Sequence, residues 1–259
     1  MNELARKHLL RALDSGVRYD GRKTDEYRNI LIEYGISETS EGSARVTIGN
    51  TVVIAGVKLS LEAPYSDTPE DGNLMIGAEF LPIANPTFEA GPPSMDSIEV
   101  ARVTDRGIRE GHAIDTKSLM FIAGEKVWVV SVDICIINDD GNLFDASNLA
   151  ALAAIQDTKY PVVNDNKVID YKHHTEEKLK LEHLPIGVTI GKIGKYLLID
   201  PLPSEQQVLD SRLTVTLLED GTICALQKGG MESVSLDDVS AMIDLAMEKS
   251  VELRKKLQN

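Results

Sequence analysis

Cysteine and aromatic residues are scarce in this sequence of 259 residues, and its apolar runs are short. The two cysteines, Cys135 and Cys224, each lie in an apolar stretch, where cysteine usually acts as a small buried hydrophobe. Two such residues make neither a disulfide framework nor a zinc site. The longest apolar stretches, residues 127–137 and 146–155, are too short to cross a bilayer. We therefore expect a soluble protein of the reducing cytoplasm, with no membrane partner.

Basic residues are in the minority. Lysine and arginine total 27 against 41 aspartate and glutamate residues, which gives a net charge of −14 and a pI near 4.8. This balance argues against a protein that coats nucleic acid by its overall charge, so any binding of a polyanion must be local. The hydrophobic content of 42% is that of an ordinary globular chain, large enough for one sizeable core.

Apolar periodicity predicts both strands and helices. A polar amphipathic helix is expected over residues 2–13. Another, capped by Asp96 or Ser97, should run to about Glu110, and an alanine-rich buried helix should begin at Asp145. Alternating β-branched residues broken by turn residues predict strands over 28–34, 44–49, 51–59, 74–81, 127–137, 187–199 and 213–227, followed by a last helix over 236–257.

These elements form two successive rounds of strands followed by a helix. Such an order favours an α+β fold, in which mixed sheets pack against helices. We take residues 1–259 as a single domain, with pseudo-repeat halves near 20–160 and 185–259 as an open alternative. The proline-rich stretch 82–93 predicts an extended loop, and the polar stretch 161–184 predicts a mobile connection.

Sequence motifs for cofactor, metal or nucleophile chemistry do not stand out. The glycines near Asn50 and at 229–230 lack the spacing of a nucleotide fingerprint, the five histidines lack zinc-ligand spacing, and no serine lies in a nucleophile elbow. Asp200, Glu205 and Asp210 could hold magnesium or act as acid and base. In a chain with 41 acidic residues, coincidence explains them better. We predict no catalytic residue, no metal site and no cofactor.

Three arginines form the sharpest feature of the sequence. Steps of four and three residues place Arg102, Arg106 and Arg109 on one stripe of the expected helix. Their planar guanidinium groups suit phosphate oxygens, so the stripe could clamp a nucleic-acid backbone. The alternative is a solvated helix face with local pairs, such as Asp105 with Arg109.

Several short runs, taken in their order and spacing, resemble the RNase PH family. They are 18–22 (RYDGR), 41–44 (EGSA), 49–51 (GNT), 85–93 (NPTFEAGPP), 98–109 (IEVARVTDRGIR) and 139–147 (DDGNLFDAS). The resemblance covers nearly the whole chain. Within the family, the sequence is most similar to the non-catalytic RNase PH-like subunit of the archaeal exosome.

The chain departs from active members where the family binds phosphate and cleaves RNA. The resemblance implies a glycine, then threonine or serine, then an arginine at positions 142–144, where this chain has asparagine, leucine and phenylalanine. It also places Asp96 where an active member can carry a phosphate-binding arginine. The catalytic carboxylates of the family align with Gln207 and Arg212, and a slip of one or two residues would instead bring in Glu205 and Asp210.

The resemblance also implies a role and partners. It implies a non-catalytic subunit in a ring of three heterodimers with the catalytic RNase PH-like subunit, capped by RNA-binding subunits, which degrades single-stranded RNA from its 3′ end. Arg102 and Arg106, and less firmly Arg109, would contact the RNA backbone beside the active site of the partner. Two alternatives stay open: an active phosphate-dependent exoribonuclease using Glu205 and Asp210, and a scaffold or binding protein unrelated to RNA.

Overall fold

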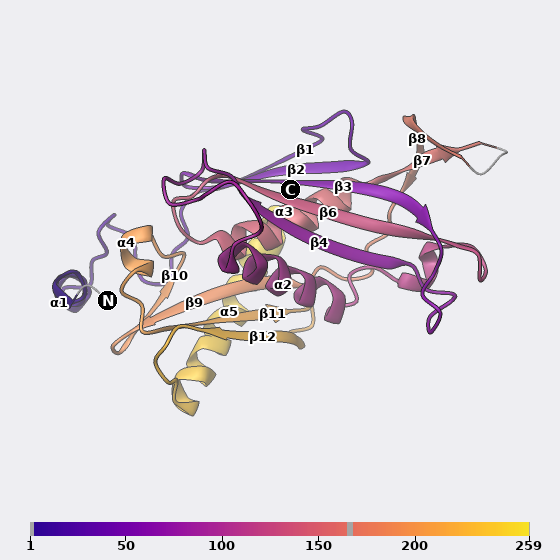
Figure 1. Cartoon of the computed structure of the whole chain (residues 1–259). Coiled ribbons are helices and arrows are strands. Elements are labelled where there is room, and N and C mark those ends of the chain that lie inside the picture. Colours follow the sequence, from indigo (N-terminus) through magenta and orange to yellow (C-terminus); the bar gives the residue numbers. More distant parts are fainter. Residues whose placement is uncertain (1–2, 165–167, 259) are drawn as a thin grey trace.

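The first sheet is built by strands whose side chains alternate between a buried and a more exposed face. In the computed structural model, which describes residues 3–164 and 168–258, its strands lie in the order β1-β2-β3-β6-β4, and β5 also pairs with β6 (Figure 1). Strand β4 is parallel to β6, and the other pairs are antiparallel. The bounds are β1 Ile30–Tyr34, β2 Gly42–Ile48, β3 Thr51–Glu62, β4 Asn73–Phe80, β5 Met120–Ile122 and β6 Lys126–Asn138.

The second sheet has four antiparallel strands in the order β10-β9-β11-β12. The single strand predicted over 187–199 is divided, because Gly194 turns the chain in the left-handed region at φ 57°. The stretch predicted as strand over 213–227 forms two antiparallel strands, β11 and β12. The bounds are β9 Ile186–Ile193, β10 Tyr196–Ile199, β11 Ser211–Leu217 and β12 Ile223–Gly229.

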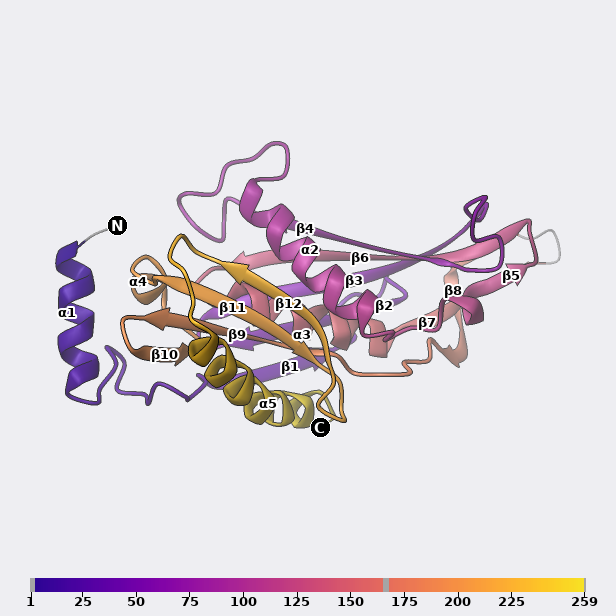
Figure 2. The ribbon, with the colours of Figure 1, turned by 90° about the horizontal axis from the view of Figure 1, so that it is seen from below.

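Helix α3, Leu143–Asp157, lies between the two sheets, with α2, Met95–Glu110, beside it (Figure 1). Every residue of α3 from Asp145 to Ile155 is buried, which explains why the sequence is alanine-rich and apolar on all sides. Helix α5, Leu236–Gln258, covers the outer face of the second sheet (Figure 2). The predicted α+β fold of mixed sheets packed against helices is confirmed, although α2 enters the first round between β4 and β6.

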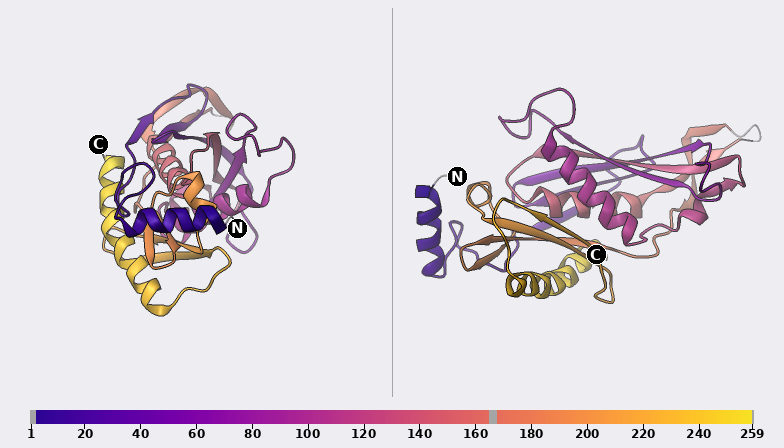
Figure 3. Two further views of the ribbon diagram at one scale, coloured as in Figure 1. Left: turned by 90° about the vertical axis from the view of Figure 1, so that its left-hand side faces the viewer. Right: turned by 60° about the horizontal axis from the view of Figure 1, so that its bottom comes forward.

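The N-terminal helix α1, Glu3–Asp14, lies across one end of the second sheet (Figure 3). Leu9 and Leu13 pack there in a small separate apolar cluster with Ile193, Leu198 and Val208. Residue 2, where the sequence places the start of this helix, lies outside the described residues. Two short elements not predicted from the sequence are the 3₁₀ helix η1, Thr116–Leu119, and helix α4, Pro203–Gln206.

Three further sequence predictions need correction. The stretch 161–184 is largely an antiparallel pair, β7 Lys159–Val163 with β8 Ile169–Lys178, whose polar side chains gave no apolar alternation; residues 165–167 lie outside the description. The N-terminal cap of α2 is Ser94 rather than Asp96 or Ser97, because the Ser94 hydroxyl accepts a hydrogen bond from the backbone amide of Ser97. Helix α3 begins two residues before Asp145.

None of the helices in the described residues has the length and apolar character needed to span a membrane.

Candidate functional site

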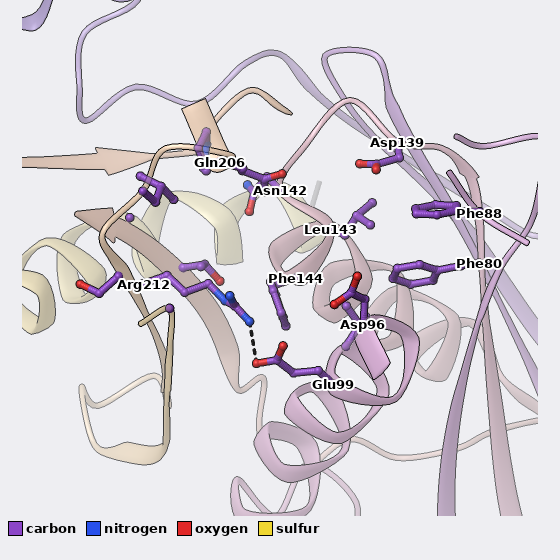
Figure 4. Close-up of a pocket in the computed structure, with 17 residues that line it drawn as sticks. Phe80, Phe88, Asp96, Glu99, Asp139, Asn142, Leu143, Phe144, Gln206 and Arg212 are labelled. Atoms are coloured by element: carbon purple, nitrogen blue, oxygen red, sulfur yellow. Dashed lines mark ion pairs between the residues drawn. The ribbon is translucent and has the colours of Figure 1, made fainter. Parts of the chain in front are cut away.

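A cavity of about 280 Å³ lies where the start of α3, the start of α2 and the second sheet meet. The rings of Phe80, Phe88 and Phe144 and the side chain of Leu143 line it together with polar groups (Figure 4). It contains most of the positions at which the sequence departs from an active RNase PH member. The other lining residues are Asp96, Glu99, Val100, Asp139, Asn142, Thr189, Gly191, Pro201, Gln206, Leu209, Ser211, Arg212 and Gly230.

The segment between β6 and α3 presents apolar side chains to this cavity. Asn142 adopts the left-handed conformation, φ 59° and ψ 45°, which asparagine tolerates better than most residues other than glycine. Its amide donates to Asp145 at 3.1 Å, and Leu143 and Phe144 follow as the first residues of α3. The turn therefore keeps a backbone suited to glycine, and it carries hydrocarbon side chains at the positions where the family resemblance places phosphate donors in active members.

Arg212 makes an ion pair across the site. Its Nη2 lies 2.6 Å from Oε1 of Glu99 on α2, and its guanidinium lies 4.6 Å from the ring centroid of Phe144 (Figure 4). Arg212 was predicted to replace a catalytic carboxylate, and the structure places a cation there that cannot act as a general base. Gln207, the other such position, is exposed at the end of α4, while its neighbour Gln206 lines the cavity.

Glu205 and Asp210, the carboxylates of the alternative catalytic hypothesis, both form ion pairs with arginines. Glu205 is fully buried. Its two carboxylate oxygens accept hydrogen bonds from Nε and Nη2 of Arg18 at 3.0 and 2.5 Å, and the backbone amide of Leu202 donates to it at 2.8 Å. The Asp210 carboxylate accepts hydrogen bonds from Nε and Nη2 of Arg6 at 3.1 and 3.0 Å, and from the backbone amide of Gly194 at 2.6 Å. Through these contacts, Asp210 holds α1 in place and Glu205 holds α4, so both acids have structural partners.

The electrostatics of Asp210 point the same way. Burial alone would raise the pKa of this carboxyl, but the hydrogen bonds from Arg6 and Gly194 and the charge of Arg6 outweigh it and hold the pKa below its ordinary value. A general base that works near neutral pH needs a pKa closer to the working pH. Asp210 is thus a fixed, ionised partner of Arg6.

Asp145 is the acid with the most perturbed environment near this site. It is completely buried at the start of α3, and burial raises its pKa to about 7, even though hydrogen bonds from Tyr27, Thr189 and Asn142 favour the ionised form. Burial and the neighbouring charge of Asp145 raise the pKa of Tyr27 well above its ordinary value. Because Tyr27, Thr189 and Asn142 all donate hydrogen bonds to the Asp145 carboxylate inside the core, we assign this carboxylate a structural role.

The predicted arginine stripe lies on the outer side of α2. Arg102 and Arg106 are exposed and line a surface groove with Ile76 and Gln227, and within the described residues neither forms an ion pair. Arg109 differs, because it binds Asp105 at 2.7 Å and donates to the carbonyl of Leu74 at 2.7 Å. Two of the three guanidinium groups therefore have no ion-pair partner in the part of the chain that the structure describes.

Sequence reasoning missed Glu99 and Gly229. Glu99 and Arg212 are far apart in the sequence, so no local sequence pattern predicts that they form an ion pair. Gly229 is paired with Arg212 across β11 and β12, and a Cβ on it would lie 2.4 Å from the Arg212 Cζ. The sequence signal was the pair of glycines at 229–230, which we considered as a nucleotide-binding motif and set aside. Among the described residues, no group of three or more His, Cys, Asp or Glu side chains could hold a metal ion.

Comparison with known proteins identifies the family. Residues 26–161 match domain 1 of the 3′ exoribonuclease family RNase PH, and residues 183–249 match domain 2. The chain is 44% identical over 259 residues to the exosome complex component Rrp42 of Thermococcus gammatolerans, covering 99% of this chain and 95% of that protein. The same component of Methanopyrus kandleri is 42% identical, covering 98% and 96%.

A solved structure shares the whole fold. A chain of the Archaeoglobus fulgidus exosome, determined with RNA bound to the active site, superimposes with a TM-score of 0.90 at 42% identity, covering 98% of both chains. A chain of an archaeal exosome core gives a TM-score of 0.87 at 38% identity, covering 99% of this chain and 97% of that one. The chain thus belongs to the RNase PH family of 3′ exoribonucleases.

Proposed function

We propose that this chain is a non-catalytic subunit of a cytoplasmic archaeal exosome ring. It pairs with a catalytic RNase PH-like subunit in a ring of three heterodimers, which RNA-binding subunits cap. Its own role is to complete the partner's active site and to bind the backbone of single-stranded RNA through Arg102 and Arg106. Relatives named as exosome components support the assembly, and the solved exosome with bound RNA supports the substrate.

One observation carries the non-catalytic part of this proposal. The Glu99–Arg212 pair and the Phe144 ring lie together in the cavity where the family resemblance places phosphate donors and catalytic carboxylates. Phosphorolysis needs cationic donors to hold inorganic phosphate, but the Arg212 guanidinium in this cavity is paired with Glu99, and Asp96 adds another carboxylate. A phosphate ion entering it would meet apolar rings, carboxylates and a guanidinium that Glu99 already neutralises.

Single-stranded RNA with magnesium and inorganic phosphate tests the proposal directly. The purified chain alone should release no nucleoside diphosphates, whereas the chain mixed with its catalytic partner should release them from the 3′ end. The same assay with the partner alone measures what assembly adds. Release of nucleoside diphosphates by this chain alone would overturn the non-catalytic assignment.

A further inference from the structure

The ion pair between Glu99 and Arg212 joins α2 to the second sheet. The two side chains retain 33% and 25% of their exposure, so the pair is partly shielded from water. Water and salt screen a shielded pair less than an exposed one, and Arg212 also lies on the Phe144 ring. The contact therefore fixes the geometry of its two elements better than an ordinary surface pair.

Gly229 provides the space in which this contact forms. It is the residue opposite Arg212 on β12, and the Arg212 guanidinium occupies the volume next to it. A methyl group on residue 229 would stand 2.4 Å from Cζ and 2.7 Å from Nη1 of that guanidinium. The guanidinium is the far end of a flexible side chain, so it would move aside while the strand keeps its place.

Glu99 belongs to the part of α2 that carries the free arginines. Arg102 follows it by three residues and Arg106 by seven, so all three share one side of the helix and line the same groove. The other end of α2 is held separately, because Gly107 packs on Thr216 and Arg109 donates to the carbonyl of Leu74. The Glu99–Arg212 pair holds the half that lies nearer Arg102.

We propose that Glu99 and Arg212 are positioning residues for RNA binding. Seated against Phe144 and Gly229, the pair fixes α2 so that Arg102 and Arg106 meet successive phosphates of the strand. Arg212 stands at the position expected to hold a catalytic carboxylate in an active member, so the former reaction site now orients the RNA-binding helix. This inference rests on the function proposed above.

A charge-neutral substitution separates positioning from electrostatics. The assay uses the ring assembled with its catalytic partner and a fluorescently labelled single-stranded RNA, with affinity read by anisotropy. Gly229→Ala changes no charge but displaces the Arg212 guanidinium, and it should weaken RNA binding on the order of threefold to thirtyfold. Gly56→Ala is the matched control, because a methyl group on this glycine of β3 meets nothing within 4 Å. Wild-type affinity in Gly229→Ala would overturn the inference.

Removal of the Glu99 charge gives a second test, because the two explanations predict opposite changes in RNA affinity. By charge alone, Glu99→Gln should tighten RNA binding, because it deletes a carboxylate beside two arginines that face a polyanion. If the pair positions α2, Glu99→Gln instead weakens binding, raising KM for RNA degradation while kcat at saturating RNA stays within about twofold. Tighter binding, or an unchanged KM, would contradict the positioning role.

One further variant separates this inference from the function on which it rests. Arg102→Gln combined with Arg106→Gln removes the proposed RNA contacts themselves. If this double variant binds RNA normally, the RNA-binding role of the chain is wrong. If it binds weakly while Gly229→Ala and Glu99→Gln bind normally, the arginines bind RNA but the Glu99–Arg212 pair does not position them.

Discussion

At the scale of single residues, the buried pair of Arg18 and Glu205 shows how an acid can be structural inside a family of enzymes. Both side chains are fully buried, and Arg18 also donates to the carbonyls of Ile199 and Asp200 at 2.9 Å. Glu205→Gln leaves the guanidinium without its counter-charge, so it should lower the free energy of unfolding by about 3–5 kcal/mol in denaturant titrations.

The exposed pair of Glu33 and Arg45 supplies the control for that measurement. Their side chains retain 37% and 44% of their exposure, so Glu33→Gln should change stability by less than about 1 kcal/mol. At a temperature where Glu205→Gln stays folded, the assembled ring should still degrade RNA. Loss of degradation with unchanged stability would instead support Glu205 as a catalytic acid.

Asp145 gives the fold a pH dependence of a defined sign. Its pKa is about 7 in the folded chain and about 3.9 in an unfolded chain, so between these values the folded state holds a proton that the unfolded state has released. The contribution of Asp145 to stability therefore falls as pH rises from 4 to 7 and levels off above the folded pKa. From pH 5 to 7, the wild type should lose about 2 kcal/mol relative to Asp145→Asn. Parallel stability curves for the two proteins would contradict this assignment.

At the scale of elements, α2 combines a buried face with an exposed arginine stripe, which in the proposed function binds RNA through phosphate contacts. Each phosphate contact to a single strand contributes about 0.7 to the slope of log affinity against log salt, so Arg102→Gln with Arg106→Gln should flatten that slope by about 1.4. Arg109→Gln should change it less, because Asp105 already binds that guanidinium. Arg45→Gln, on β2 of the first sheet, is the control and should leave the slope unchanged.

Elements with a clear apolar period could be predicted from the sequence, and contacts between distant segments could not. The alternation around Val53 predicted β3, and the run after Asp145 predicted α3, because one or both faces of these elements are buried. Strand β8 carries polar residues on both faces and gave no such signal. At the site, the arginine stripe and the apolar residues Leu143 and Phe144 were visible in the letters, whereas the Glu99–Arg212 pair depends on how the second sheet meets α2.

At the scale of the whole molecule, the two sheets share one apolar core, and we propose that the chain unfolds as a single unit. The main core cluster runs from Val46 in the first sheet through Leu149 of α3 to Val215 in the second. Leu149→Ala should cost about 2–5 kcal/mol, because α3 is buried between the sheets and a cavity remains. The loss should be equal by Trp128 fluorescence, which reports the first sheet, and by hydrogen exchange of the β11 amides, which reports the second. If β11 opened at a lower free energy while Trp128 was unaffected, the chain would be two independently folding units joined at α3.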